Sequence, residues 1–355
     1  MALSCIREIG SVRFTRLYEK YGAIEKVYNF KAEDLRSLRL AEEKIRDIVK
    51  QRDRLQPEQE LSKVLAAGIK PITIFADEYP EQLKHIYAPP YILYTVGKVE
   101  LLKKKNWLAI VGTRQPSFYG MKMTTLFSQE LVKNGWGIVS GMAKGIDAKA
   151  HETALINEGK TIAVLGCGID VIYPYENKHL YKEIREKGLI LSEMPLGTEP
   201  QAFQFPLRNR IITGLAKGTL VIEGDYKSGA MISGKTALDQ DREVFALPGR
   251  ATDVASNGPN WLIKQGAKPA TDIQDILEEF GVKNAVKKTV KNEVIKYFSK
   301  EENIVFQELV EEDSKNIEVL SEKTGLEFTT LLMILSGLEL KGYIKQLPGK
   351  LFIRC

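Results

Sequence analysis

The chain has 355 residues, 44% of them hydrophobic, which is enough for two or three domains with cores of their own. Its formal net charge of +5 excludes a globally basic protein of the histone kind. Three scattered cysteines and three dispersed histidines argue against a disulfide scaffold and a metal site, and predict a reducing compartment. The N-terminal segment is too charged for a signal peptide and no stretch approaches the roughly 18 apolar residues of a membrane helix, so we expect a cytoplasmic protein without a membrane partner.

Residues 1–65 predict a small helical domain. Phe14, Leu17, Tyr18 and Tyr21 recur at helical spacing, and Gly22 follows as a helix stop. The segment 6–22 also has a faint likeness to a helix-hairpin-helix, whose glycine turn offers backbone N–H groups to a phosphate. We expect a packing domain of the SAM-like or helix-hairpin-helix-like kind.

The middle of the chain, residues 66–281, alternates short apolar runs with amphipathic stretches. The runs are 107–112, 137–141, 161–168, 189–193, 219–224 and 243–249. Continuous apolar strands separated by helices are typical of a parallel sheet that is covered on both faces. The pattern therefore predicts an α/β fold with an extended, Rossmann-like, doubly wound and mostly parallel sheet, to which segments near 71–76 and 89–97 add strands.

The tail, residues 288–355, predicts a winged helix. Helical patterns cover 289–299, 317–325 and 327–343, and 344–354 reads as a hairpin. From Lys283 onward the tail carries 12 Lys/Arg against 11 Asp/Glu. Because reading DNA requires a basic face, this balance favours a contact with another protein over a contact with DNA.

Three glycine-containing loops follow strands of the predicted sheet. Helix N-termini and the carboxyl ends of parallel strands meet at one edge of such a sheet, where anions bind. The residues of interest are Gly112, Thr113 and Arg114, then Gly141, Lys144 and Gly145, then Lys227, Ser228 and Gly229. The loops predict phosphate binding, although glycines that serve only the turns are the alternative. None matches the dinucleotide fingerprint, so no nucleotide cofactor is expected.

Arg208 and Arg210 flank Asn209 at the start of an apolar helix. Positive charge is unfavourable at a helix N-terminus unless an anion compensates for it. The pair could therefore form a bidentate phosphate clamp, or could form ion pairs with Glu193 or Glu223. Asn209 could support the loop or act as a simple cap.

Residues 229–236 spell the phosphate-binding loop of nucleotide triphosphatases, G-x-x-x-x-G-K-[ST]. However, the preceding apolar strand ends several residues earlier, and residues 230–233 are compatible with a helix. We interpret the spelling as accidental, with Lys235 a solvated side chain that could still touch a DNA backbone.

Two further features have structural and functional interpretations. Asp147 and His151 stand four residues apart, which favours an ion pair and helix cap over acid–base catalysis. Aromatic side chains adjoin the basic loops and could stack on bases or pack in the core. They are Phe118, Tyr119, Phe203, Phe205 and Tyr226.

Six segments, taken in order, resemble the DNA-processing protein A family, also called DprA or Smf. They are residues 111–120, 139–155, 161–181, 192–224, 228–238 and 244–267. This resemblance implies an extended Rossmann domain that binds single-stranded DNA without hydrolysing nucleotides. It also implies protection of incoming strands during natural transformation, loading of a RecA-class recombinase, and a homodimer. One departure is Ser233-Gly234, where the family continues into Thr-Ala, and this departure creates the triphosphatase spelling.

The resemblance also implies the DNA-contacting residues, with no catalytic residue, cofactor or metal. The implied contacts are Gly112, Thr113, Arg114, Ser140, Gly141, Ala143, Lys227, Ser228, Gly229, Arg208 and Arg210, to which the loop patterns add Lys144 and Asn209 as support. Two alternatives stay open: a nucleotide-processing enzyme of the phosphoribohydrolase or triphosphatase kind on a related sheet, and a protein-interaction module built on the winged helix.

Overall fold

The computed structural model describes residues 1–6, 8–282, 299–309, 314–340, 343–347 and 349–354. The chain forms two compact units, Met1–Lys283 and Asn284–Cys355. Across the described ranges, no helix is long and apolar enough to span a bilayer.

Six short helices open the first unit. They are η1 (Ala2–Cys5), α1 (Ser11–Tyr21), α2 (Ile24–Tyr28), α3 (Ala32–Ser37), α4 (Glu42–Arg54) and α5 (Pro57–Ala66). The helix α1 ends at Gly22, whose φ of 68° lies in the left-handed region, as the glycine stop predicts. Buried Phe14 and Leu17 share one core with Tyr91 and Ile190 of the sheet region. The predicted boundary near residue 65 stays a prediction.

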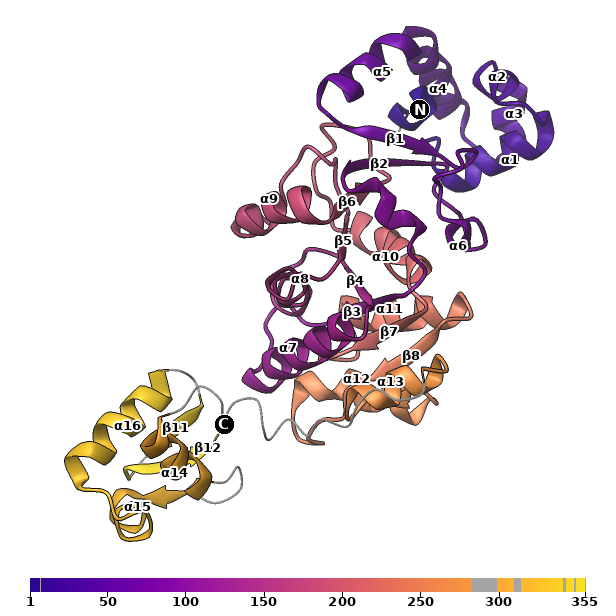
Figure 1. Ribbon diagram of the computed structural model, residues 1–355. Coiled ribbons are helices and arrows are strands. Elements are labelled where there is room, and N and C mark those ends of the chain that lie inside the picture. Colours follow the sequence, from indigo (N-terminus) through magenta and orange to yellow (C-terminus); the bar gives the residue numbers. More distant parts are fainter. Residues whose placement is uncertain (7, 283–298, 310–313, 341–342, 348, 355) are drawn as a thin grey trace. The chain divides into compact units, whose positions relative to one another are not determined.

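A nine-stranded sheet follows, in the order β1-β2-β6-β5-β4-β3-β7-β8-β9 (Figure 1). The strands are β1 (Lys70–Thr73), β2 (Ile92–Gly97), β3 (Trp107–Val111), β4 (Gly137–Ser140), β5 (Thr161–Leu165), β6 (Leu189–Ser192), β7 (Gly218–Val221), β8 (Glu243–Ala246) and β9 (Lys268–Pro269). The pairs β1/β2 and β2/β6 are antiparallel and the rest are parallel. The predicted extended Rossmann-like sheet is thus confirmed.

Helices cover both faces of this sheet, which explains why its strands are continuous apolar runs. One face carries α7 (Phe118–Lys133), α8 (Ile146–Ile156) and α9 (Lys178–Lys187), and the other carries α10 (Gln204–Leu215) and α11 (Gly229–Asp239) (Figure 1). The remaining helices are α6 (Glu81–Lys84), α12 (Asn257–Lys264) and α13 (Ile273–Glu279), with single 3-10 turns η2 (Val99–Lys103), η3 (Tyr175–Asn177) and η4 (Val254–Ser256). The strand order reverses between β3 and β7, so ligand sites are expected at the nearby carboxyl ends.

The second unit is a winged helix, as predicted. It contains α14 (Lys300–Glu308), β10 (Lys315–Asn316), α15 (Ile317–Thr324), α16 (Phe328–Leu340), β11 (Ile344–Leu347) and β12 (Leu351–Arg354), with the sheet order β10-β12-β11. Phe306, Leu331 and Leu335 belong to its buried core. The helix predicted over 289–299 lies, apart from Ser299, outside the described residues, and α14 was not predicted.

The segment with the triphosphatase spelling is helical. Because α11 begins at Gly229, the residues between the two glycines of the motif form helical turns and cannot wrap around phosphates. Gly234 packs toward Leu262, and the Lys235 ammonium lies 5.2 Å from the ring centroid of Trp261. The helical interpretation of these residues is confirmed.

Candidate nucleic-acid interface

A small cavity of about 60 Å³ opens at the carboxyl ends of β4 and β5, next to the start of α10. Its lining combines cationic, aromatic and glycine residues from four connections of the sheet. They are Arg114, Gly141, Ala143, Lys144, Leu165, Gly166, Cys167, Tyr173, Pro174, Phe205 and Arg208. We call this the β4–β5 cavity.

Arg114 is an exposed cation at the β4–β5 cavity. Its guanidinium carbon lies 5.6 Å from the ring centroid of Phe205, and the ring of Phe205 stacks on Tyr173 with centroids 5.6 Å apart. Within the described parts of the chain, no acidic side chain pairs with Arg114. A charged fork beside the exposed ring of Tyr173 and the half-buried ring of Phe205 suits a phosphate and its base.

Lys144, the second cation at this cavity, is paired with Glu176 from the connection after β5. Both side chains are more than half exposed, at 51% and 63%. Exposed pairs contribute little to stability, so an incoming phosphate could replace Glu176 at small cost.

Arg208 forms the buried floor of the cavity rather than an exposed clamp. Its Nη1 donates to the backbone carbonyl of Gly141 at 2.7 Å and to that of Val164, and its Nε donates to Oδ1 of Asn209 at 3.2 Å. Burial lowers the pKa of Arg208 to about 10, so the guanidinium is still charged at neutral pH. A Cβ at Gly141 would approach Arg208 Nη2 to 2.6 Å, which explains the glycine.

The first two glycine loops lie against each other. The Ile146 amide donates to the Thr113 carbonyl at 3.3 Å. Gly145 has a φ of 81°, and a Cβ there would come within 2.5 Å of the same oxygen. The second loop therefore needs a glycine at this position to place Lys144 and Ala143 beside Arg114.

Internal carboxylates occupy two of the expected anion positions. The Gly141 amide donates to Oδ2 of buried Asp147 at 3.1 Å. Burial, the largest influence, raises the pKa of Asp147. At the start of α7, the Ser117 amide donates to Oε2 of Glu223 at 2.9 Å, and the Ser117 hydroxyl donates to Oε1. An additional anion at either position would meet a carboxylate already bound there.

Asp147 and His151 do not form the expected ion pair with each other. Instead, Nδ1 of His151 bonds to the Thr161 hydroxyl at 2.6 Å. Ser140, expected at the DNA, is fully buried and its hydroxyl donates to the Ile110 carbonyl at 2.6 Å. Its side chain therefore holds two strands together.

The third loop is open but stands apart from the lining of the β4–β5 cavity. Lys227 and Gly229 are exposed, and no ion pair of Lys227 occurs among the residues the structure covers. Ser228 has a buried Oγ without a hydrogen-bond partner in the part of the chain that the structure describes. The Asn209 side chain donates to the Gly229 carbonyl at 3.4 Å, so Asn209 does link this loop to α10.

Arg210 is not part of a clamp with Arg208. It forms an ion pair with Glu193, both side chains being nearly buried at 13% and 12% exposure, and it lines a different cavity. The expectation of a joint clamp is therefore wrong, and the ion-pair alternative with Glu193 describes Arg210. Residues two apart in a helix point in different directions, which is the physical reason.

Sequence reasoning missed Tyr173, Pro174, Gly166 and Cys167 as lining residues. They belong to the connection after β5, whose position beside β4 could have identified them. Burial raises the pKa of Cys167 to about 11, so its thiol is protonated at neutral pH. In the parts of the chain that are described, no group of three or more His, Cys, Asp or Glu could hold a metal ion.

Comparison with known proteins matches this arrangement to a family. The model of the DNA recombination-mediator protein A family matches residues 70–281. This chain belongs to that family. A model of the DprA winged helix domain matches residues 299–350.

Relatives and solved structures agree with the family. The chain is 44% identical to the DNA processing protein DprA of Bacillus subtilis over 63% of this chain and 77% of that one, and 38% identical to the protein Smf of Synechocystis over 79% and 72%. The structure of DprA from Streptococcus pneumoniae matches with a TM-score of 0.70 and 36% identity, covering 78% of this chain and 95% of that one. That of DNA processing protein A from Helicobacter pylori, described for its single-stranded DNA binding mode, matches with a TM-score of 0.55 and 35% identity over 60% and 95%.

Proposed function

We propose that this protein binds single-stranded DNA and leaves the strand intact. The observation that carries the proposal is the exposed Arg114, which has no acidic partner among the described residues, beside the stacked rings of Phe205 and Tyr173 at the β4–β5 cavity. An arginine fork binds a backbone phosphate, and an exposed ring binds any base, so the combination favours strands without regard to sequence. The Helicobacter pylori relative, described as binding single-stranded DNA, supports the same reading.

The predicted contacts divide into two groups by their exposure. Arg114, Lys144, Lys227 and Gly229 are exposed, and we propose that they meet the strand together with Thr113 and Ala143 at the loop surfaces. Gly112, Ser140, Gly141, Ser228, Arg208 and Asn209 are proposed to hold the loops in place. Arg210 is not among the proposed contacts at this cavity, because Glu193 neutralises it.

We propose that the protein is not an enzyme. Glu223 accepts from the Ser117 amide at the N-terminal end of α7, and Asp147 accepts from the Gly141 amide directly after β4, at positions where a nucleotide phosphate would otherwise bind on this fold. In addition, α11 offers a helix in place of a phosphate-binding loop. These features argue against both the triphosphatase and the phosphoribohydrolase alternatives.

The proposed biological role is the protection of incoming DNA during natural transformation, in the cytoplasm, and the loading of a RecA-class recombinase by a homodimer. A protein contact of the winged helix is supported by α16, whose sequence contains no Lys or Arg and whose Phe328, Leu332 and Met333 are exposed. An apolar helix of this kind is unsuited to a DNA groove. Light scattering at several concentrations tests the dimer.

Incubation of the protein with a labelled single strand, with ATP and with AMP tests the proposal. We expect the strand to be bound, to be recovered at full length, and to be accompanied by no nucleotide product. Turnover of ATP or AMP, or a shortened strand, would contradict it.

A further inference from the structure

A second cavity, of about 820 Å³, lies between the N-terminal helices and the start of α10. Its lining includes Gly10, Arg13, Arg16, Tyr87, Glu193, Phe203, Leu207 and Arg210. The first turn of α10 separates it from the β4–β5 cavity, because Phe205 and Arg208 line one and Phe203 and Leu207 line the other. We call it the α1–α10 cavity.

One end of the α1–α10 cavity suits an anion. The helix α1 starts at Ser11 after Gly10, with no side-chain cap and no acidic residue in its first turn, so no side chain of its own cap or first turn compensates its first amides and its positive dipole end. A Cβ at Gly10 would meet nothing within 4 Å, so the approach is open. Arg13 and Arg16 follow on the same helix, and Arg16 is exposed without an ion pair in the described ranges.

The other end of the cavity suits a planar base. Phe203 and Leu207 are half exposed, at 49% and 50%, and Tyr87 is 81% exposed. The same lining includes the Arg210–Glu193 pair, in which Nη1 of Arg210 is buried and has no hydrogen-bond partner among the described residues. A buried donor without a partner is costly, and a ligand that carries an acceptor would complete it.

We infer that the α1–α10 cavity holds one nucleotide unit of the bound strand, with the phosphate at the first turn of α1 and the base against Phe203 and Leu207. The inference rests on the proposed single-stranded DNA function. It extends the strand path across the first turn of α10, from Phe205 in one cavity to Phe203 in the other. The N-terminal helices thereby become part of the binding surface.

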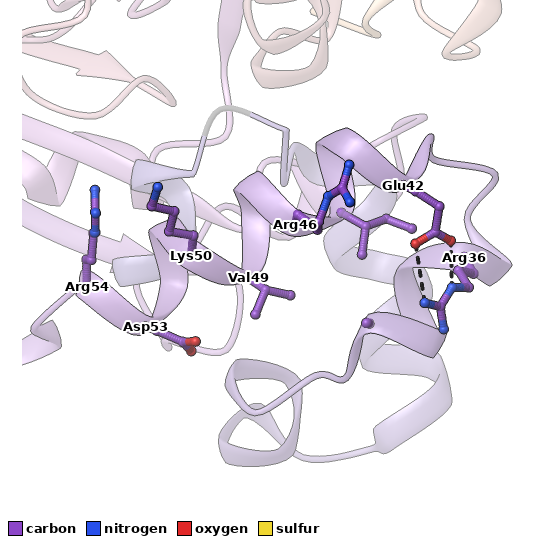
Figure 2. A pocket seen from close by; sticks show the side chains of 9 residues that line it. Arg36, Glu42, Arg46, Val49, Lys50, Asp53 and Arg54 are labelled. Carbon is purple, nitrogen blue, oxygen red and sulfur yellow. Dashed lines mark hydrogen bonds and ion pairs between the residues drawn. The ribbon is translucent and has the colours of Figure 1, made fainter.

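The helix α4 supplies a matched control for charge. Arg46, Lys50 and Arg54 recur every four residues along it and are exposed, beside the ion pair of Arg36 with Glu42 (Figure 2). They can attract a strand only through their general positive field. Arg46→Ala therefore removes the same charge from the same helical region as Arg16→Ala, outside the α1–α10 cavity.

The test uses the full chain and oligonucleotides of about 4 to 16 nucleotides, which span common single-strand site sizes. Phe203→Ala and Arg16→Ala are compared with Arg46→Ala and with Ile156→Ala, a change at a 78% exposed side chain of α8. We expect Phe203→Ala and Arg16→Ala to bind the shortest strands with wild-type affinity and to bind the longest strands about tenfold more weakly than wild type. We expect the two control variants to match wild type at every strand length. A 2-aminopurine placed along the strand should report stacking at one position, and Phe203→Ala should abolish that signal.

The outcomes separate this inference from the function on which it rests. If wild type binds no single strand at any length, the proposed function fails. If Arg114→Ala weakens binding while Phe203→Ala and Arg16→Ala match their controls at every length, the inference alone is overturned. Equal losses of affinity for Arg16→Ala and Arg46→Ala would show that Arg16 acts only through the general positive field, and would contradict a phosphate site in the cavity. Free dAMP that binds wild type and is displaced by no oligonucleotide would show a free-nucleotide site and contradict the strand path.

Discussion

The guanidinium carbon of Arg114 lies 5.6 Å from the ring centroid of Phe205, although 91 positions of sequence separate the two residues. The loop after β3 and the start of α10 bring them together at the carboxyl edge of the sheet. A cation over a ring is held in place by the ring's negative face, which prepares the guanidinium for a phosphate before the strand arrives.

Arg114→Ala should weaken single-strand binding about tenfold or more, and by the same factor for strands of different sequence. The reason is that Arg114 is proposed to contact the phosphate backbone and not the bases. Removal of one phosphate contact should also reduce the salt slope by about 0.7. Fluorescence anisotropy at several salt concentrations measures both quantities. Arg114→Lys should keep most of the slope but lose affinity, because a point charge cannot form the fork.

Phe205→Ala should cost about 1–3 kcal/mol of binding free energy, the usual value of one stacked base. Phe205→Tyr should retain binding, since it keeps the ring face. The matched control is Phe118→Ala, which removes a ring that is 63% exposed and outside the β4–β5 cavity. A loss for Phe118→Ala equal to that for Phe205→Ala would place the stacked base elsewhere.

Glu223→Gln should destabilise the first unit by about 1–3 kcal/mol, because the Ser117 amide and hydroxyl both donate to its carboxylate. The charge also faces the start of α7, where a carboxylate is favourable. Urea unfolding followed by tryptophan fluorescence measures the change. Glu152→Gln, on the exposed surface of α8, should leave the unfolding midpoint unchanged.

His151 should make the fold sensitive to acid. Burial lowers its pKa from 6.5 to about 3, so above pH 6.5 both states are neutral and His151 contributes no pH dependence. As the pH falls below 6.5, His151 becomes protonated in the unfolded chain but stays neutral in the folded protein. The free energy of unfolding should then fall by about 2 kcal/mol at pH 5. His151→Gln should remove most of the difference between pH 7 and pH 5, and an unchanged pH dependence would contradict this assignment.

The strands were predictable because a sheet buried on both faces requires continuous apolar runs, and 107–111 and 161–165 are such runs. β9, with only Lys268 and Pro269, carries no such signal. Helical spacing should have separated Arg208 from Arg210, since positions two apart face different sides.

The filling of the glycine loops by carboxylates was not predictable from the sequence. Glu223 reaches Ser117 across 106 positions, and no local pattern encodes that contact. The same applies to Tyr173, which stacks on Phe205 from a separate connection. Local sequence therefore identified two of the loops that line the candidate site, while the tertiary fold decides which of their groups are already bound by internal partners.

The most direct test of the central claim compares a single strand with a duplex of the same sequence in a filter-binding assay at two salt concentrations. We predict tight, salt-dependent binding of the single strand, much weaker binding of the duplex, and a loss with Arg114→Ala for the single strand. Equal affinity for the two forms of DNA, with no effect of Arg114→Ala, would contradict the account.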